Sequence, residues 1–442
     1  MMKCDVPAGF IPHLLALALL AAPLGPAAAA GALPAAAPAS APSTWPPPVL
    51  AKTAWPVTGG NIQHNCRSPY AGPERPTLKW HMADFDKHFG IAMRSVTIGR
   101  EHTLYVAGGM AGMYAIDTQT QKVKWTLRTA GQDTGKGAWK EPWVEDAATV
   151  AADGTLYVAS ENGFLYALAE DGAVRWKFAE TYHLHSTPTP YRDGSILVPS
   201  EDAYLYCIGP GGRLQWRFQF HARPLGTTTR DSLPTYDAAG TIYFTGNGAL
   251  WAVSPDGRQV WSDRSGEDKA NGPAMGKDGT LYWMTHKNGQ LLATTPQGKR
   301  RWSARLPNIF ERNIALGADD TLYVGSGDGN LYAVSPADGT VKWKFNVGSP
   351  RYFGGVKSDA LVDARGVIYA YAYDGTLYAL YDRGDRAEEK WRFSLGIQDT
   401  FYPGVGLALD ADGTLYLASS AAQGGTFVLV AIQDKQDAAG KE

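Results

Sequence analysis

Residues 149–178, TVAADGTLYVASENGFLYALAEDGAVRWKF, hold four short β-prone runs separated by three turn signals. The four runs are residues 149–151, 156–159, 165–168 and 174–178. The turn signals are Asp153-Gly154, Asn162-Gly163 and Asp171-Gly172. Asp-Gly and Asn-Gly between apolar runs strongly favour β-hairpins, because glycine accepts a positive φ. The stretch therefore predicts one four-stranded antiparallel sheet.

The same unit occurs eight times along the chain. Its second strand starts near Leu104, Leu156, Ile196, Ile242, Leu281, Leu322, Ile368 and Leu415. The first seven copies each end in a tryptophan, namely Trp125, Trp176, Trp216, Trp261, Trp302, Trp343 and Trp391. Repeats of about 40–50 residues with four strands each are typical of β-propeller blades.

The eighth copy ends at Ile432 without a tryptophan, and the missing segment stands before the first copy as Leu78-Lys79-Trp80. An N-terminal strand that completes the last repeat closes a ring and hides the edges of an open array. We therefore predict an all-β, eight-bladed β-propeller of four-stranded antiparallel blades. An N-terminal strand, Leu78–His81, is expected to complete the blade built from Gly404–Ile432.

The N-terminus has the features of an export signal. Lys3 precedes an apolar core at 14–22, and Ala27–Ala30 offers a cleavage region of small residues. We predict a signal peptide at 1–30, an Ala/Pro-rich linker at 31–54, the propeller at 55–433 and a disordered tail at 434–442. The mature chain is expected in the periplasm or outside the cell, as a monomer without a transmembrane segment.

Charge and cysteine content exclude some partners. The chain has 41 basic and 43 acidic residues, a net charge of −2 and no basic run, so nucleic acid is not an expected partner. Cys66 and Cys207 remain once Cys4 leaves with the signal. We interpret them as isolated buried thiols, although an oxidising compartment would permit one disulfide.

Aromatic residues recur at fixed repeat positions. Seven of the eight second strands carry a tyrosine after the first aliphatic residue, and Leu197 is the exception. Such regular tyrosines and tryptophans are expected to pack between adjacent sheets. The alternative is that the tryptophans form a platform for carbohydrate.

These repeats resemble those of quinoprotein alcohol dehydrogenases and of the outer-membrane assembly lipoprotein BamB. Ala115–Trp125 is similar to the tryptophan-docking motif of that superfamily, and Ala333–Trp343 repeats it. The lead-in from Trp55 to Pro73 is similar to that of secreted members. The resemblance covers nearly all of Trp55–Ile432 and implies a PQQ-like β-propeller.

The chain departs from both well-defined activities of the superfamily. Quinone-dependent dehydrogenases carry an adjacent cysteine pair beside pyrroloquinoline quinone and calcium, and this chain has no Cys-Cys. Assembly lipoproteins carry a cysteine just after the apolar signal core, which is also missing. We therefore expect no cofactor, with the quinone and calcium belonging to the competing enzyme hypothesis.

The repeat pattern places polar residues where inner strands meet the channel. In such a ring, the outer-to-inner loops and the turns between second and third strands share one face. The expected ligand-binding residues there are Arg94, Asp146, Glu161, His183, His185, Asp231, Asn271, Arg312, Lys357 and Tyr402. Ser186, Ser232 and Ser358 stand at the corresponding inner-strand positions of other blades, and Glu145, Glu201, His286 and Asp328 occupy related positions. The alternative is that polar residues at a channel mouth border water and need no ligand.

Signals for catalysis are weak. His183 and His185 could bind a metal together with a carboxylate, but two histidines with one intervening residue occur by chance, and no metal site is predicted. Glu145 and Asp146 are adjacent and are expected to point to opposite faces of a strand. No His-Glu-x-x-His, Gly-x-Ser-x-Gly or Cys-x-x-Cys motif is present, so no catalytic residue is assigned.

The leading hypothesis is an exported, non-enzymatic binding or assembly scaffold that uses the loop-rich channel face to bind a protein or an envelope ligand. One alternative is a quinone-dependent dehydrogenase or a polysaccharide-acting enzyme. Another is a lectin-like propeller that binds cell-envelope glycans.

Overall fold

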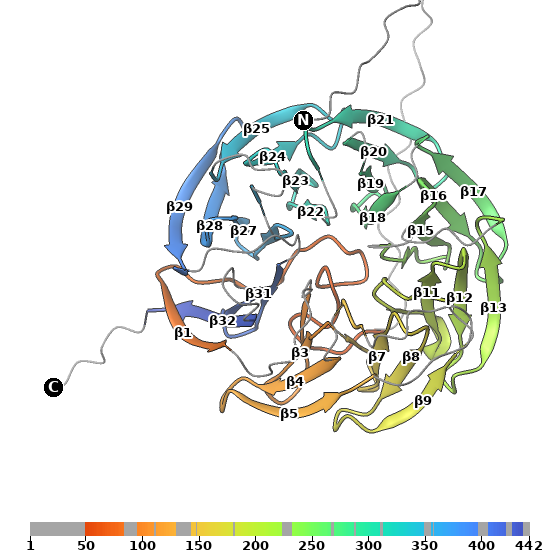
Figure 1. Ribbon diagram of the computed structural model, residues 1–442. Helices are drawn as coiled ribbons and strands as arrows, with labels where there is room; N and C mark the ends of the chain where they lie inside the picture. The colour runs from red at the N-terminus through yellow and green to blue at the C-terminus, as the bar shows by residue number, and fades with distance from the viewer. Residues whose placement is uncertain are drawn as a thin grey trace, which may run out of the picture. The chain divides into compact units, whose positions relative to one another are not determined.

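The computed structural model is an all-β ring of eight blades, as the repeats predict (Figure 1). Each blade is a four-stranded antiparallel sheet. Among the described residues the helical content is one 3-10 turn, η1 (Arg192–Gly194). The described residues are 49–83, 95–109, 112–129, 143–146, 148–179, 182–222, 232–266, 269–286, 289–309, 313–348, 355–356, 358–396, 405–420 and 427–435.

Within each of the first seven blades, the strands follow chain order from the channel outward. Blade one contains β2 (Val96–Ile98), β3 (Thr103–Ala107), β4 (Met113–Asp117) and β5 (Lys122–Leu127). Blade two contains β6 (Thr149–Val150), β7 (Leu156–Ala159), β8 (Leu165–Leu168) and β9 (Val174–Phe178). Blade three contains β10 (Thr189–Pro190), β11 (Ile196–Ser200), β12 (Tyr204–Ile208) and β13 (Leu214–Gln219). Blade four contains β14 (Thr235–Tyr236), β15 (Ile242–Gly246), β16 (Ala249–Val253) and β17 (Gln259–Arg264). Blade five contains β18 (Ala270–Met275), β19 (Leu281–Thr285), β20 (Gln290–Thr294) and β21 (Arg300–Arg305). Blade six contains β22 (Ala315–Leu316), β23 (Leu322–Gly325), β24 (Asn330–Val334) and β25 (Val341–Asn346). Blade seven contains β26 (Leu361–Val362), β27 (Val367–Tyr371), β28 (Thr376–Asp382) and β29 (Ala387–Ser394).

The eighth blade is assembled from both ends of the chain, which confirms the predicted ring closure. It contains β30 (Gly406–Leu409), β31 (Leu415–Ser420), β32 (Phe427–Asp434) and β1 (Pro76–Ala83). Strand β1 pairs antiparallel with β32, with Leu78 opposite Ile432 and Trp80 opposite Ala431. The ring therefore has no free edge inside the wheel, and its closure depends on hydrogen bonds rather than on a covalent link.

Aromatic side chains join neighbouring blades, as the sequence predicts. Seven of the eight outer-strand tryptophans lie beside the tyrosine of their own blade; Trp125 and Tyr105, for example, have ring centroids 5.8 Å apart. Trp216 is the exception, because its blade has Leu197 at the tyrosine position. The indole Nε1 of Trp125 donates a hydrogen bond of 2.8 Å to the Glu170 carbonyl in the next blade. Equivalent bonds to the following blade are donated by Trp176, Trp261, Trp302, Trp343 and Trp391.

The closing blade differs from this pattern. Within the part of the chain that the structure describes, the buried Nε1 of Trp80 has no hydrogen-bond partner. In blades two to seven, the turn between the third and fourth strands contains a glycine. The corresponding turn of blade one is Thr118–Gln121, which has no glycine. Strand pairing between β1 and β32, each eight residues long, therefore holds this junction more than indole docking does.

The hydrophobic core is divided among the interfaces between blades. Tyr105 and Ala107 of blade one pack with Val150 and Leu156 of blade two, for example. One cluster spans blades seven, eight and one, and joins Ile98 to Leu409 across the closure. Stability of each blade thus depends on its neighbours, as in other repeat architectures.

The N-terminal segment 55–68, here called the central segment, runs through the middle of the ring (Figure 1). Its residues form hydrogen bonds with or beside the innermost strands of blades one to seven. These bonds join Ile98 to Trp55, Val150 to Pro56, Thr187 to Thr58, Pro234 to His64, Met275 to Gln63, Leu316 to Asn65 and Val362 to Cys66. Such a segment cross-links the ring from inside, a role that its sequence, without strand or helix periodicity, does not predict.

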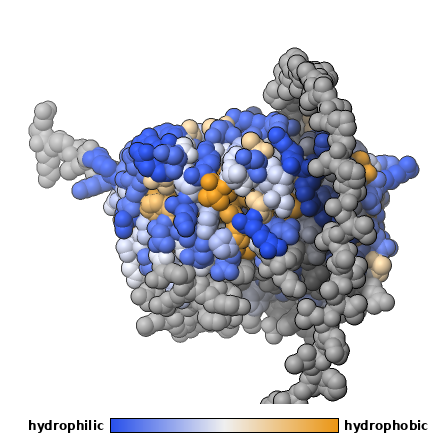
Figure 2. Space-filling model, turned by 90° about the horizontal axis from the view of Figure 1, so that it is seen from above, coloured by the Kyte–Doolittle hydropathy of each residue, from blue (hydrophilic) through white to orange (hydrophobic). Residues whose placement is uncertain are grey.

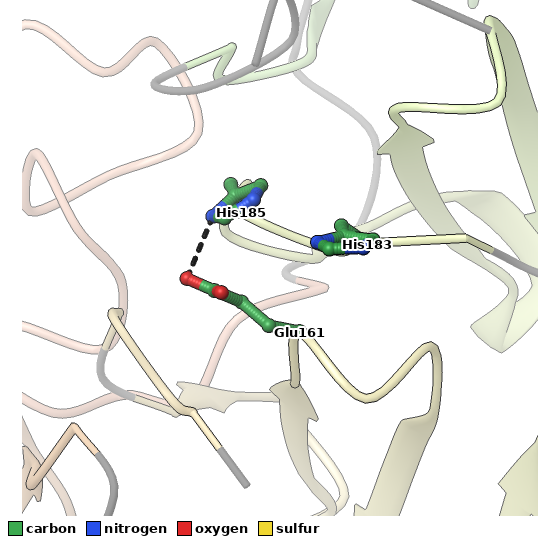
Figure 3. A group of neighbouring side chains, drawn as sticks. All are labelled: Glu161, His183 and His185. Atoms are coloured by element: carbon green, nitrogen blue, oxygen red, sulfur yellow. Dashed lines mark ion pairs between the residues drawn. The ribbon is translucent and has the colours of Figure 1, made fainter. Parts of the chain in front are cut away.

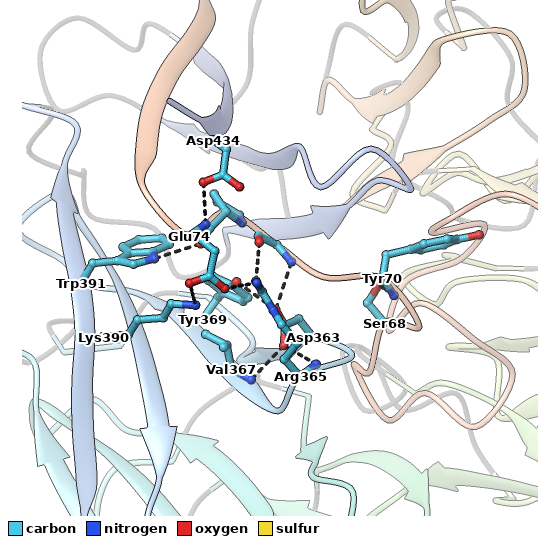
Figure 4. A network of polar contacts seen from close by, with 12 residues as sticks. Ser68, Tyr70, Glu74, Asp363, Arg365, Val367, Tyr369, Lys390, Trp391 and Asp434 are labelled. Atoms are coloured by element: carbon cyan, nitrogen blue, oxygen red, sulfur yellow. Dashed lines mark hydrogen bonds and ion pairs between the residues drawn. The ribbon is translucent and has the colours of Figure 1, made fainter. Parts of the chain in front are cut away.

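A buried polar network fixes the chain between the central segment and β1 (Figure 4). The fully buried carboxylate of Asp363 accepts hydrogen bonds from the amides of Gly72 at 3.0 Å and Val367 at 2.9 Å. Arg365 pairs with both Asp363 and Glu74. The amides of Glu74 and Arg75 donate to Asp434, so the network ties blade seven to both strands of the closure.

The residues just before the ring contact blade two. The predicted signal peptide lies outside the described residues. The final residues of the predicted linker, 49–54, contact blade two, where the Ala51 amide donates to Val150 and the Ala152 amide donates to Val49. No helix among the described residues is long and apolar enough to cross a membrane. Cys66 and Cys207 are buried free thiols, as interpreted from the sequence.

The outer strands expose apolar side chains singly. The large exposed residues are Leu78, Val123, Val174, Leu214, Val260 and Val341, all on outer strands and on six different blades. The side of the ring in Figure 2 is mainly hydrophilic, with small hydrophobic areas among charged ones. Scattered apolar residues of this kind need no partner.

Trp261 docks on the turn that contains Gly298, which provides a test of blade packing. A Cβ at Gly298 would lie 2.7 Å from the Trp261 ring, whereas one at Gly384, in the equivalent turn of blade seven, would meet nothing within 4 Å. Both glycines have a positive φ, +83° and +90°. We expect Gly298→Ala to lower the free energy of unfolding by about 1–3 kcal/mol more than Gly384→Ala. Equal losses in urea denaturation would contradict this packing.

Candidate functional site

One face of the ring, here called the channel face, is built from two sets of connections. The outer-to-inner loops and the turns between second and third strands are hydrogen bonded to each other there, as expected. The Glu161 amide donates to Trp143, Glu201 to His183, Gly327 to Asn308 and Tyr373 to Gly355. These bonds hold the loops of blades two, three, six and seven on a rigid scaffold.

Five ionisable side chains meet on this face between blades two and three. His183 and His185 lie on the loop between β9 and β10, and Glu161 lies on the turn between β7 and β8 (Figure 3). Glu145 precedes β6, and Glu201 lies on the turn between β11 and β12. The exposed fractions of Glu145, His183, His185 and Glu201 are 5%, 3%, 4% and 2%. We call these five residues the His–Glu cluster.

His185 lies at the centre of the His–Glu cluster. Its Nδ1 is 3.0 Å from Glu161 Oε1 and 3.3 Å from Glu145 Oε2, and its Nε2 is 3.2 Å from Glu201 Oε1. His183 Nδ1 lies 4.0 Å from the other oxygen of Glu201. Carboxylates on both sides of one imidazole favour its doubly protonated form.

The electrostatic environment changes the basicity of His185 strongly. Burial disfavours the charged ring, but hydrogen bonds and charge from Glu145 and Glu161 outweigh burial and raise the pKa of His185 to about 10. The protonated His185 ring is therefore a cation at neutral pH and serves as the counter-ion of the carboxylates.

Local hydrogen bonds hold the cluster residues in place. The Tyr182 amide donates to Ser200 Oγ at 3.2 Å, and the rings of Tyr182 and His183 lie 4.4 Å apart. On the opposite side, Ser160 Oγ donates to the Trp143 carbonyl at 3.1 Å. The histidine loop and the glutamate turns are thus fixed to the strands of their own blades.

The other described candidate residues do not join the His–Glu cluster. Asp146 accepts hydrogen bonds from Thr187 at 3.0 Å and from Ser95 at 3.4 Å, whereas Glu145 contacts His185. The two carboxylates thus have different partners, but both residues precede β6 and do not lie on a strand as expected. Asn271 lies in blade five and contacts His286. The remaining predicted residues lie outside the described residues, namely Arg94, Asp231, Arg312, Lys357 and Tyr402.

The interpretation that inner-strand polar residues border water is wrong for four positions. Ser186, Ser232, Asn271 and Ser358 are fully buried. Ser232 accepts the Thr245 amide at 3.2 Å, and Ser358 accepts the Tyr371 amide at 2.9 Å. The hydroxyl groups of these two serines accept amide hydrogens at the end of the second strand of their own blade, so both serines have a structural role.

Glu145 and Glu201 were not among the binding residues predicted from the sequence. A signal for both was present in the repeat. Glu145 and His185 occupy equivalent positions in blades two and three, as do Glu161 and Glu201. Because these positions repeat from blade two to blade three, the repeat brings both pairs of ionisable groups to the interface between these two blades.

The His–Glu cluster can hold a proton or a cation. Imidazole nitrogens and carboxylate oxygens are ligands of divalent transition metals. Glu161, His183 and His185 each offer a ligand atom, and these atoms all lie within 4.8 Å of one another. The cluster has no serine or cysteine nucleophile among its members.

A small cavity lies elsewhere, between the central segment and the inner strands of blades one, seven and eight. Its lining includes Trp55, Thr58, Cys66, Asp359 and Gly406. Burial, together with the charge of Asp359, raises the pKa of the Cys66 thiol, so this cysteine is protonated and unreactive at neutral pH.

Comparison with protein families identifies one match. The family model described as outer membrane protein assembly factor BamB matches residues 128–271, 180–313 and 287–434, which together exceed half of the chain. No curated protein matches the sequence.

Several solved structures share the fold. Quinohemoprotein alcohol dehydrogenase from Comamonas testosteroni is 14% identical, with a TM-score of 0.65 over 87% of this chain and 81% of that chain. BamB from Moraxella catarrhalis is 18% identical, with a TM-score of 0.58 over 83% and 99%. A europium-containing methanol dehydrogenase is 14% identical, with a TM-score of 0.64 over 86% and 98%. At these identities the likeness shows the fold alone.

His185→Gln tests the charge balance of the cluster. The change leaves three carboxylates without their central cation, so we expect the free energy of unfolding near neutral pH to fall by about 3–5 kcal/mol. Because the pKa of His185 is raised from 6.5 to about 10, its stabilisation is full below about pH 6.5 and is lost as pH rises through 10.

Denaturant unfolding of wild type and variant, in buffers without divalent ions, should show their difference shrinking between about pH 6 and pH 10. His81→Gln, an exposed histidine on β1, is the control and should change little. A difference that grows with pH would contradict the assigned ion pairs.

Proposed function

This chain belongs to the family described as outer membrane protein assembly factor BamB, and we propose that it is a non-enzymatic scaffold that binds a protein through its channel face. The proposed location is the cell envelope, in the periplasm or outside the cell, reached by export through the segment 1–30. Fold alone does not decide between a scaffold and an enzyme, so the proposal rests on the site.

The central segment is the observation that carries the proposal. Hydrogen bonds from residues 55–68 reach the inner strands, or the residues just before them, in seven blades. The middle of the wheel is therefore occupied by the chain itself. What the ring offers to a partner is a broad face of loops and turns on a rigid base, and such surfaces serve recognition.

Residues of the channel face suit a protein partner. Half-buried Trp143, Tyr182 and Tyr373 lie on its loops and turns, and aromatic residues are frequent anchors in protein interfaces. Asp374, next to Tyr373, and Ala222, on the loop after β13, are exposed and offer positions for probes. The loop that contains Ala222 is tied to the turn of β11 and β12, since the Phe220 amide donates to Ala203.

The sequence also weighs against the dehydrogenase hypothesis. The chain has no adjacent cysteine pair. Its two described cysteines are buried free thiols in different places, Cys66 in the central segment and Cys207 on β12. Binding rather than turnover is therefore the function that we assign.

Site-specific photo-crosslinking in intact cells tests the proposal. A benzophenone amino acid at Ala222 or Asp374 probes the channel face. The same probe at Arg213 or Asp385, exposed on turns between third and fourth strands, probes the opposite face. We expect a defined protein adduct from the first two positions and none from the controls.

Charge changes on the same face give a second measure. With the probe at Ala222, Asp374→Arg should lower the adduct yield by about tenfold or more, because interface cores tolerate inserted charge poorly. Arg213→Glu with Asp385→Arg should leave the yield unchanged. Adducts only with glycan, equal adducts from both faces, or quinone-dependent dye reduction by the purified protein would contradict the proposal.

A further inference from the structure

We propose that Glu161, His183 and His185 bind a divalent transition-metal ion between blades two and three, with Glu145 and Glu201 beside it. This site goes beyond the proposed partner binding and does not depend on it. It differs from a surface cluster of charges because four of the five residues of the His–Glu cluster are buried and because these residues come from separate connections of two blades.

The spacing of the ligand atoms fits one ion. One oxygen of Glu161 and one nitrogen of each histidine lie within 4.8 Å of one another, and His185 Nδ1 is 3.0 Å from Glu161 Oε1. Ligand atoms of a tetrahedral zinc site lie about 3.3 Å apart, since each is about 2.0–2.1 Å from the metal. Small side-chain rotations therefore bring the three groups to ligand distances (Figure 3).

The charge of the cluster also suits a dication. Three carboxylates carry three negative charges. A divalent ion held by neutral imidazoles offsets two of them, which lowers the cost of burying the carboxylates.

The chemistry of the ligands selects the class of metal. Imidazole nitrogen favours zinc and its first-row neighbours, whereas calcium and magnesium prefer oxygen alone. Glu145 and Glu201 lie within 3.3 Å and 3.2 Å of the two nitrogens of His185, where they can accept its remaining N–H or complete the coordination. A zinc-like ion is the expected occupant.

Burial indicates a structural site. The side chains of His183 and His185 are 4% and 2% exposed, and that of Glu161 is 13% exposed. Structural zinc sites are closed in this way, whereas catalytic ones keep an open position. An ion here would join the histidine loop of blade three to the glutamate turn of blade two on the channel face.

The test uses the full mature chain, purified without a histidine tag and stripped with a chelator. Titration with Zn²⁺ in a calorimeter should show about one tight site per chain, with Ca²⁺ giving no heat at the same concentrations. Thermal unfolding should move to higher temperature as Zn²⁺ is added, because the ion binds the folded state.

Substitutions locate the site. His183→Gln and Glu161→Gln should weaken Zn²⁺ binding by about 100-fold or more, and Glu145→Gln by about 10–100-fold. His81→Gln and Glu170→Gln, which change a histidine and a glutamate outside the cluster, are the matched controls and should bind like wild type. Circular dichroism reports whether each variant retains the β-sheet fold.

X-ray absorption at the zinc edge keeps the proposal testable should a variant fail to fold. Wild type with stoichiometric Zn²⁺ should show scattering from two imidazoles and from oxygen ligands. Absence of stoichiometric binding by wild type, a spectrum without imidazole, or undiminished binding in folded His183→Gln would overturn the proposal. A failed crosslinking experiment at the channel face would leave these results unaffected.

Discussion

Closure of the ring is the constraint on which the rest of the structure depends. Eight sheets with apolar faces can bury those faces only if the first sheet meets the last. Strand β1, from the N-terminal part of the chain, forms the outer strand of the blade of β30, β31 and β32, so that strands from both ends of the chain lie in one sheet. Strand β1 adds Trp80 and Met82 to the hydrophobic cluster that joins Ile98 to Leu409. Every blade interface therefore gains from one non-covalent junction.

The central segment strengthens the same junction from inside. Residues that precede β1 touch the inner strands of blade after blade before the chain reaches its place in the closing sheet. Asp363 and Arg365 then fix the turn into β1 through Gly72 and Glu74. Loops on the channel face rest on this base, and the His–Glu cluster forms where equivalent positions of blades two and three approach each other. The rigid backbone keeps two histidines and three glutamates in register, and four of these five residues are buried.

The repeat made the architecture predictable from sequence. Asp-Gly turns and regular tryptophans specify the strands, and the displaced Trp80 specifies the closure and its partner strand. The central segment was beyond such reasoning because residues 55–68 have no period, and their bonds go to seven different blades. Repeat alignment also placed Ser232 and Ser358 at a channel mouth, but their hydroxyl groups accept strand amides in the interior. It brought Glu161 and His185 to one face, yet the distances that make Glu145 and Glu201 part of the same cluster follow from side-chain positions that alignment does not give.

A disulfide across the closing sheet tests the account most directly. Thr77 on β1 lies opposite Gln433 on β32, and the native Cys66 and Cys207 are buried. The account predicts that Thr77→Cys with Gln433→Cys forms an intramolecular disulfide on mild oxidation and raises the unfolding temperature, since it links chain ends that are far apart in sequence. Thr77→Cys with Gln259→Cys, on the outer strand of another blade, should remain reduced. Failure of the first pair to cross-link in the folded protein would contradict ring closure by the N-terminal strand.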